Sequence, residues 1–333
     1  MRIWYDACTG KHIRYGSAIS QRLRKKGHQI VFTTRKHPDT IPLAQLLGEK
    51  PIVVGEYNTT NLSNRLEESS KRILEFSKMF RNNPPDIAIA HQSVELCRTA
   101  FGLGIPIILT ADTPHAIAVN RLTIPFASTV VASKAIPPKF WKEQCAKKIV
   151  YFNGVDEIAW IKNAKPKPES LIKKPLIIFR QIESKAVYAK NKMDYSKLII
   201  KQLESLGNVQ FIQRYNKKGK DSTKEGFIDS ANLVAYADLV ISAGGTLARE
   251  AALRGVPSLV ISDIGKTYVN EYLVEKGFPI FFINPQKIFY YAKKHIGKRI
   301  DVSAEIRNLE NPVDKIEKIV QEISQGNRTQ NNQ

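Results

Sequence analysis

Short apolar runs alternate with longer amphipathic stretches along most of this 333-residue chain. In the first half, the apolar runs predict strands at residues 2–6, 29–34, 51–54, 86–90 and 106–109. The amphipathic stretches there predict helices at residues 14–26, 62–81 and 93–103. Strands that alternate with helices form parallel βαβ units, so the pattern predicts an α/β fold with helices on both faces of a parallel sheet.

The alternation is interrupted once, in the Pro/Lys-rich stretch NAKPKPESLIKKP at residues 163–175. It restarts with predicted strands at residues 176–179, 209–212, 239–242, 258–262 and 280–283, and ends with a predicted helix at 312–323. We therefore expect an N-terminal Rossmann-like domain over 1–152, a hinge or linker over 153–174, a C-terminal Rossmann-like domain over 175–325 and a disordered tail over 326–333. Two such domains would face each other across a cleft, where ligands of parallel sheets bind.

Polar and titratable residues follow three of the predicted strands in the first half. Lys11 and His12 follow the first strand, His91 follows a second, and Asp112 and His115 follow a third. Each histidine alone is explained as well by an ordinary hydrogen-bonded side chain, but their convergence on one sheet edge favours a site. No His or Cys spacing typical of a metal site accompanies them, so we expect no metal.

The stretch YDACTGKHIRYGSAI at residues 5–19 places a glycine, a lysine and a histidine at the start of a helix. It is not a P-loop, because Tyr5 stands where the first glycine is needed and His12 where Ser or Thr would hold magnesium. We expect His12 to remain neutral near the helix N-terminus, where it would accept a proton from an incoming hydroxyl group. The alternative is that His12 only shapes the turn. Asp112 is the next candidate base.

The second half carries the sharper motif, ADLVISAGGTLAREAALRGVPSLVI at residues 237–261. A predicted strand runs through Ser242 into Gly244, Gly245 and Thr246, and a helix follows at once. Paired glycines allow a ligand to approach the backbone, and the helix start offers free N–H groups, so this turn suits a phosphate or pyrophosphate. Glu250, one turn into the helix, would accept hydrogen bonds from sugar hydroxyls. The alternative is a tight turn followed by a surface glutamate.

These segments resemble the GT-B glycosyltransferases and the related UDP-N-acetylglucosamine 2-epimerases. In that superfamily a Gly-rich turn holds the nucleotide phosphates and a glutamate in the next helix holds the ribose. Thr9-Gly10-Lys11-His12 resembles the T-G-G-H loop of the peptidoglycan N-acetylglucosaminyltransferase, whose histidine lies near the acceptor. From YDACTGKH through ADTPHAIAVNRLTIPFA to SAGGTLAREAALRGVP, nearly the full chain is similar to a largely archaeal family of unknown function within this superfamily. The resemblance also implies that the last helix packs back across the hinge.

The chain departs from its relatives at several motifs. Lys11 replaces the second glycine of T-G-G-H, and the epimerases' opening G-T-R-P-E is absent. FRQIESKA replaces the Gly-rich loop that many transferases carry after the first strand of the second domain. Its Arg180 and Glu183 resemble, loosely, the H-R-x-E-N loop of the epimerases. The motifs therefore support membership of the superfamily more firmly than either activity.

Composition adds one unusual figure, a formal net charge of +20 from 51 basic and 31 acidic residues. Such a field attracts nucleic acid, anionic membrane surfaces or phosphorylated substrates, although solvated basic helix faces explain it equally. No apolar run reaches the ~20 residues of a membrane span. No signal-peptide core opens the chain, and the three cysteines form no C-x-x-C pair. We expect a cytoplasmic protein, with peripheral contact at the inner membrane surface left open.

Our leading hypothesis is a metal-independent glycosyltransferase with a nucleotide-sugar donor and no further cofactor. The donor pyrophosphate would lie on Gly244–Thr246, with Ser242, Arg180 and Lys266 offsetting its charge. Lys11, His91 and His115 would line the acceptor side, which suits an anionic acceptor such as a lipid phosphate. The second hypothesis is a UDP-N-acetylhexosamine 2-epimerase or sugar-nucleotide hydrolase, with His91, Asp112 and Glu183 as acid/base groups. A basic nucleic-acid-binding protein is the least favoured, since no RNA-binding signature is present.

Overall fold

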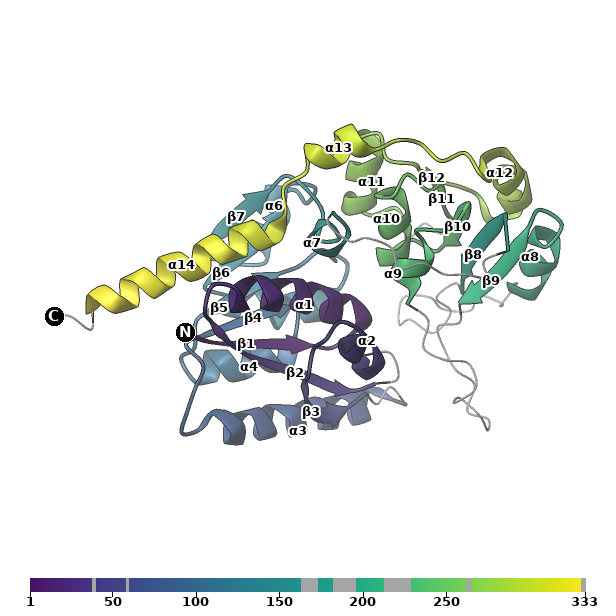
Figure 1. Ribbon diagram of the computed structural model, residues 1–333. Helices are drawn as coiled ribbons and strands as arrows, with labels where there is room; N and C mark the ends of the chain where they lie inside the picture. The colour runs from purple at the N-terminus through teal and green to yellow at the C-terminus, as the bar shows by residue number, and fades with distance from the viewer. Residues whose placement is uncertain are drawn as a thin grey trace. The chain divides into compact units, whose positions relative to one another are not determined.

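The computed structural model describes residues 1–37, 40–57, 60–162, 173–181, 196–212, 229–261 and 265–330 (Figure 1). The chain divides into two compact units. The first contains Met1–Trp160 together with Glu310–Gln333, and the second contains Ile161–Leu309. Residues 163–172 of the predicted hinge lie outside the described residues.

The first unit is built on a seven-stranded parallel sheet with the strand order β3-β2-β1-β4-β5-β6-β7. Its strands are β1 (Arg2–Ala7), β2 (Gln29–Lys36), β3 (Ile52–Glu56), β4 (Ile87–His91), β5 (Ile107–Thr110), β6 (Thr129–Ser133) and β7 (Ile149–Phe152). The order reverses between β1 and β4, which are neighbours in the sheet. Parallel sheets bind ligands beyond the carboxyl ends of the strands at such a switch point.

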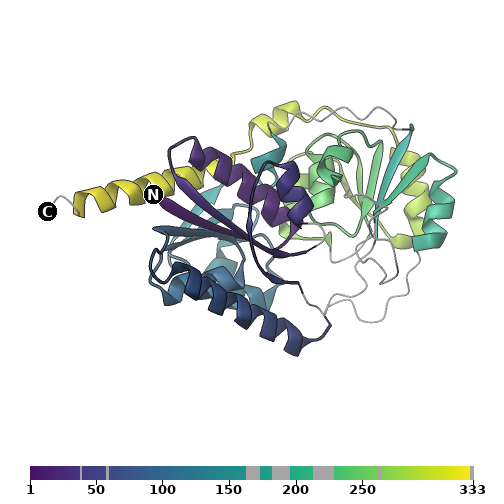
Figure 2. The same ribbon diagram turned by 60° about the horizontal axis from the view of Figure 1, so that its bottom comes forward.

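Helices cover both faces of this sheet (Figures 1 and 2). They are α1 (Gly10–Arg24), α2 (Thr40–Leu46), α3 (Leu62–Phe80), α4 (Val94–Gly102), α5 (Ile117–Arg121), α6 (Pro138–Glu143), α7 (Ile158–Ile161) and α14 (Pro312–Gln330). Helix α1 contacts α2 and α14, whereas α3 contacts α4 on the other face. The side chains of β1 alternate accordingly. Ile3 and Tyr5 enter the core beneath α1, while Trp4 packs against the rings of Phe76 and Phe80 of α3.

The last helix belongs to the first unit, although the sequence placed residues up to 325 in the second domain. Val313, Ile316, Ile319 and Val320 of α14 form one apolar stripe that is buried in the core of the first unit. The helix therefore packs back as the resemblance implied. It also continues through residues 326–330, where the sequence predicted a tail, and residues 331–333 lie outside the described part.

The second unit contains a five-stranded parallel sheet with the order β12-β11-β10-β8-β9. Its strands are β8 (Leu176–Arg180), β9 (Asn208–Ile212), β10 (Leu239–Ser242), β11 (Ser258–Val260) and β12 (Ile280–Phe282). Its helices are α8 (Ser196–Leu203), α9 (Ser230–Leu233), α10 (Thr246–Ala252), α11 (Tyr268–Glu275), α12 (Ile288–His295) and α13 (Ser303–Arg307). The switch point lies between β8 and β10. Two parallel sheets confirm the predicted α/β fold class, and none of the described helices is long and apolar enough to cross a membrane.

Candidate functional site

The carboxyl end of β1 continues directly into α1 at the switch point of the first sheet. Thr9 is the N-cap of α1, and its hydroxyl accepts a hydrogen bond from the backbone N–H of His12. Lys11 and His12 therefore lie in the first turn of the helix, at the edge where the strands end. The Thr-Gly-Lys-His stretch folds as a capped helix start because Thr is a good N-cap residue.

Lys11 lies within a group of carboxylates that the sequence revealed only in part. Its ammonium Nζ is 2.5 Å from Asp112 Oδ2, 2.9 Å from Asp156 Oδ2 and 3.8 Å from Glu157 Oε1. The side chains of Asp156 and Glu157 are only 4% and 0% exposed. Three carboxylates thus surround one ammonium group, so the positive charge of Lys11 is neutralised by groups of the protein itself.

His91 joins the same group from the end of β4. Its Nδ1 is 2.8 Å from the hydroxyl of Thr110, and its Nε2 is 3.4 Å from Asp112 Oδ1. The ring of His12 packs edge-on against it, with 5.0 Å between the ring centroids. The structure thus brings together His12, His91, Lys11 and Asp112, as predicted from the strand ends, whereas His115 is exposed.

His12 is held in one orientation by the backbone. Its Nδ1 accepts a hydrogen bond from the N–H of Cys8 at 3.3 Å, and its own carbonyl accepts one from the hydroxyl of Tyr5. Burial lowers the pKa of His12 well below its usual 6.5, and the nearby His91, Lys11 and Arg35 lower it further. The ring is therefore neutral at pH 7. A neutral ring that accepts at Nδ1 carries its proton on Nε2, so this hydrogen bond assigns His12 as a donor.

A buried ion-pair network holds the end of β1, which directly precedes Cys8. Arg72 of α3 is 1% exposed, and its guanidinium lies 2.8 Å from Asp6 Oδ1 and 3.1 Å from Glu95. Asp6 also accepts hydrogen bonds from the hydroxyls of Thr33 and Ser93. Every strong partner of this buried carboxylate comes from a different element, so the network fixes the end of β1. Sequence reasoning did not find Arg72.

Cys8 is not suited to act as a nucleophile. It is buried, and burial together with the negative charge of Asp6 raises the pKa of its thiol to about 12. Thiolates, not thiols, carry out nucleophilic chemistry. Its Sγ lies 3.4 Å from Asp6 Oδ2, which is the geometry of a weak donor.

The ligand atoms of His91, Asp112 and Asp156 lie within 4.8 Å of one another, a grouping that could hold a metal ion. Sequence spacing did not indicate this grouping, since its members come from three separate strand ends. The ammonium of Lys11 contacts both of the carboxylates, and a divalent cation would have to displace it. The predicted absence of a metal thus depends on Lys11, and it stays a prediction.

In the second unit, the paired glycines form the turn between β10 and α10. Gly244 and Gly245 have φ angles of +91° and +84°, which side chains rarely adopt. A Cβ on Gly244 would lie 2.5 Å from the Cα of Gly265, so the fold itself requires this glycine. A Cβ on Gly245 would have no atom of the described residues within 4 Å, so those residues leave the space above Gly245 open. The buried Ser242 hydroxyl accepts a hydrogen bond from the Gly244 N–H and stiffens the turn.

The other residues predicted for the donor side lie around this turn with one exception. Arg180 ends β8, which is the strand next to β10, so it lies at the same switch point. Glu250 is only 2% exposed, which rules out the alternative of a surface glutamate. Lys266 is exposed and lies 3.7 Å from Glu271. Glu183 lies outside the described residues.

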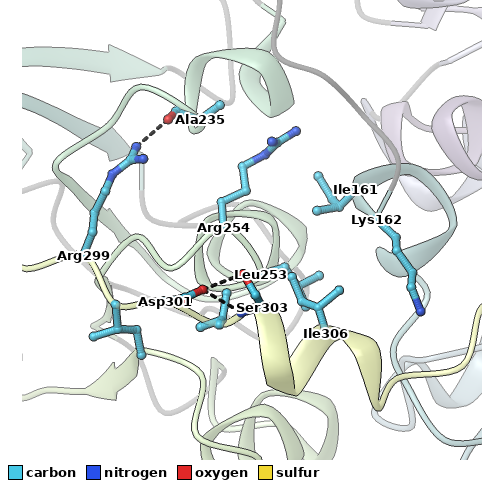
Figure 3. Close-up of a pocket in the computed structure, with 11 residues that line it drawn as sticks. Ile161, Lys162, Ala235, Leu253, Arg254, Arg299, Asp301, Ser303 and Ile306 are labelled. Carbon is cyan, nitrogen blue, oxygen red and sulfur yellow. Dashed lines mark hydrogen bonds between the residues drawn. The ribbon is translucent and has the colours of Figure 1, made fainter.

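A cavity of about 350 Å³ lies elsewhere in the second unit (Figure 3). Its lining includes Ala235, which precedes β10, and Arg254, which follows α10. These positions belong to the edge of the sheet where the strands begin, whereas the glycine turn is at the edge where they end. Arg299 on its rim donates hydrogen bonds to the carbonyls of Ala235 and Ala237. The cavity is therefore separate from the predicted donor site.

Two parallel sheets in two compact units, each with polar groups gathered at its switch point, define an α/β protein of two Rossmann-like units. The chain belongs to the family described as "Protein of unknown function (DUF354)", which matches residues 1–325. It is 28% identical to the uncharacterized protein MJ0665 of Methanocaldococcus jannaschii over 94% of this chain and 95% of that protein.

Solved structures share the fold at low sequence identity. The kitacinnamycin glycosyltransferase matches with a TM-score of 0.59 and 12% identity, over 96% of this chain and 97% of its own. The putative UDP-N-acetylglucosamine 2-epimerase of Listeria monocytogenes matches with a TM-score of 0.63 and 13% identity, over 94% of this chain and 92% of its own. The S. aureus MnaA–UDP complex matches with a TM-score of 0.65 and 15% identity, over 94% of this chain and 92% of its own. These likenesses confirm the GT-B-like fold.

Proposed function

We propose that this protein is a glycosyltransferase that uses a nucleotide-activated sugar as its donor. The observation that carries the proposal is the turn at Gly244 and Gly245 at the switch point of the second sheet, where none of the described residues fills the space above Gly245. A diphosphate needs close approach to backbone N–H groups, and a side chain at Gly245 would prevent it. The fold shared with glycosyltransferases and with a UDP complex supports the same assignment.

On the donor side, Arg180 and Lys266 would offset the charge of the diphosphate without a metal ion. Arg180 ends the strand that neighbours β10, and the exposed Lys266 directly follows Gly265, beside the turn. A hydrogen bond to a charged group contributes about 1.5–3 kcal/mol, so the two residues together would contribute about 3–6 kcal/mol to binding of a diphosphate. Glu250, buried in α10, would accept hydrogen bonds from the ribose hydroxyls.

On the acceptor side, we assign His12 as a hydrogen-bond donor and Asp112 as the base. The acceptor oxygen would form a bond to the anomeric carbon of the sugar while the bond from that carbon to the diphosphate breaks. Asp112 would take the acceptor's proton. Because Asp156 also contacts the ammonium of Lys11 at 2.9 Å, Lys11 keeps an ionised partner when Asp112 is protonated. The neutral His12 would orient the substrate through its Nε2–H.

These contacts favour a hydroxyl group over a phosphate as the acceptor group nearest to Lys11. The ammonium is surrounded by Asp112, Asp156 and Glu157, and another anion there would be repelled. An anionic acceptor such as a lipid phosphate would therefore place its charged part away from this group.

A UDP-N-acetylhexosamine 2-epimerase or hydrolase is the second candidate. The Listeria structure described as a putative UDP-N-acetylglucosamine 2-epimerase matches with a TM-score of 0.63, compared with 0.59 for the kitacinnamycin glycosyltransferase. An epimerase would use His91 and Asp112, whose side chains are 3.4 Å apart, as acid/base groups. It needs no acceptor, so turnover of a sugar nucleotide alone distinguishes it from a transferase.

The direct test measures the melting temperature with a series of nucleoside diphosphates and sugar nucleotides. A specific nucleotide at one hundred times its dissociation constant adds about 2.7 kcal/mol to the free energy of unfolding. A stabilising sugar nucleotide is then incubated alone and with candidate acceptors, and its consumption is measured. Consumption only with an acceptor supports the transferase. Consumption without one, giving an isomeric sugar nucleotide, supports the epimerase, and no stabilisation by any nucleotide contradicts both.

A further inference from the structure

The segment from Lys276 to Ile300 is a strongly basic stretch of the second unit. It contains six Lys or Arg residues and no Asp or Glu, so it carries six of the chain's net twenty positive charges in less than a tenth of its length. Among the residues that the structure describes, no carboxylate pairs with Lys287, Lys293, Lys294 or Lys298, and all four are exposed. Within the described part of the chain, the positive charge of this surface is therefore not neutralised.

Helix α12, within this segment, exposes aromatic side chains beside these lysines. Ile288 and Ala292 face the core of the second unit, and α12 lies against α8 on one face of the sheet (Figures 1 and 2). On the other side of the helix, Phe289 and Tyr290 are 39% and 62% exposed. Lys293 and Lys294 follow them by four residues, so each aromatic ring lies one helical turn from an ammonium group.

Exposed apolar residues alone do not indicate a partner, as α3 of the first unit shows. Leu62 and Leu66 on α3 are 73% and 70% exposed, more than either aromatic residue of α12. The lysines of α3, however, are paired within the helix. Lys71 contacts Glu67 at 2.7 Å, and Lys78 contacts Glu75 at 2.8 Å. Of these two helices, α12 is the one that combines exposed aromatic rings with lysines for which the described residues offer no acidic partner.

We propose that α12 and the basic segment around it dock this protein onto an anionic lipid surface. A helix with Phe and Tyr on its exposed side and lysines beside them lies in the interface between headgroups and acyl chains. Unpaired lysines are attracted to anionic headgroups, and each contributes about fivefold to binding near the surface. Single-stranded nucleic acid, the competing anion, is bound in grooves that follow its backbone, whereas α12 presents a convex helix. The proposal does not depend on the enzymatic activity.

The test is sedimentation of the full chain with vesicles of phosphatidylcholine alone or mixed with phosphatidylglycerol. We expect binding to the mixed vesicles only, weakening as salt rises. K293E together with K294E should lower this binding about 100-fold or more, and Tyr290→Ser several-fold. The matched control is K71E with Leu66→Ser on α3, which should leave binding unchanged. All these side chains are exposed, and unchanged melting temperatures will show that the variants are folded.

Equal binding to both kinds of vesicle would overturn the proposal, as would α12 variants that bind like the unmodified chain. The same variants are also tested with single-stranded RNA. RNA binding that depends on Lys293 and Lys294, without vesicle binding, would make the surface a nucleic-acid site. Vesicle binding lost in the α12 variants and kept in the α3 control supports docking, whether or not any sugar nucleotide is bound.

Discussion

The two switch points of this protein present their chemistry in opposite ways. At the first sheet, side chains supply it: Lys11, His12 and Asp112, which are partly buried, and the buried His91 are linked to one another by contacts of 2.5–5.0 Å. At the second sheet, the backbone supplies it, through a glycine turn with open space above Gly245. A group of preoriented side chains suits proton transfer and substrate orientation, whereas a bare turn suits a diphosphate. The comparison supports the division of roles between the two units that the proposed transferase requires.

The largest effect on stability is expected from breaking the buried ion pair of Arg72 and Asp6 at the end of β1. Arg72→Met leaves the buried carboxylate of Asp6 without its cation, which typically destabilises a protein by 3–5 kcal/mol. The measurement is urea-induced unfolding of the full chain. Arg22 provides the control, because its half-exposed guanidinium pairs with Asp314 and Glu317 near the surface, and Arg22→Met should lower the free energy of unfolding by about 1 kcal/mol or less for each pair. Adding Asp6→Asn to Arg72→Met should recover part of the loss. Equal losses from Arg72→Met and Arg22→Met would show that the network does not support the site.

The next effect tests the proton on His12. In His12→Asn, the side-chain amide oxygen can replace Nδ1 as the acceptor for the Cys8 N–H, but no group remains at the position of Nε2. In His12→Gln, the longer side chain places its amide group near the position of Nε2. If Nε2–H orients the substrate, His12→Asn should lower kcat by about 10²–10³-fold, and His12→Gln should lower it less. Binding of the sugar nucleotide should be unchanged in both. Equal and complete loss in both variants would instead favour His12 as the base.

Much of the fold and part of this site followed from sequence pattern. The alternation of apolar and amphipathic stretches predicted both parallel sheets, and the strand ends predicted Lys11, His12, His91 and Asp112. Asp156 and Glu157 follow the end of β7 within five residues, so the same rule was able to find them. The unit to which α14 belongs was not predictable from its own pattern, because an apolar stripe does not specify the surface it covers.

Other features depend on contacts between distant segments. Arg72 occupies the same buried face of α3 as Phe76 and Phe80, and Asp6 is the only acid in β1. Each is a charged residue among apolar neighbours, which is a signal of pairing, but nothing local pairs one with the other across 66 residues. The position of the proton on the His12 ring depends on the hydrogen bond from the N–H of Cys8. The sequence alone does not reveal this contact.

The second switch point is tested by filling the space above Gly245. Gly245→Leu should weaken nucleotide binding about 100-fold or more, since the side chain would occupy the place of the diphosphate. Gly245 has φ +84° and ψ −164°, a conformation that is essentially restricted to glycine, so strain from the new side chain also costs about 1–3 kcal/mol of stability. Gly297→Leu controls for this, because Gly297 has a φ of +73° and open space but lies after α12. Calorimetric titration with the stabilising nucleotide measures both variants. Equal affinities would place the nucleotide elsewhere.

The smallest effect concerns pH and the burial of His12. In the unfolded chain this histidine titrates near pH 6.5, whereas burial and the nearby positive charges keep its pKa well below that value in the folded protein. As the pH falls below 6.5, the unfolded chain takes up a proton that the folded chain does not bind, so the free energy of unfolding falls. One such group contributes at most about 1.4 kcal/mol per pH unit, until the pH reaches the lowered pKa.

His12→Asn removes this titration, so the difference in unfolding free energy between the two proteins should shrink in acid. Urea unfolding from pH 7 downward measures that difference, in which the other titrating groups cancel. The folded pKa of His28 is also lowered, mainly by burial, and His28→Asn therefore serves as a comparison of smaller slope. A constant difference between His12→Asn and the unmodified chain would mean that His12 titrates as it does in water. The first switch point would then lack the neutral donor that distinguishes it from the bare turn of the second.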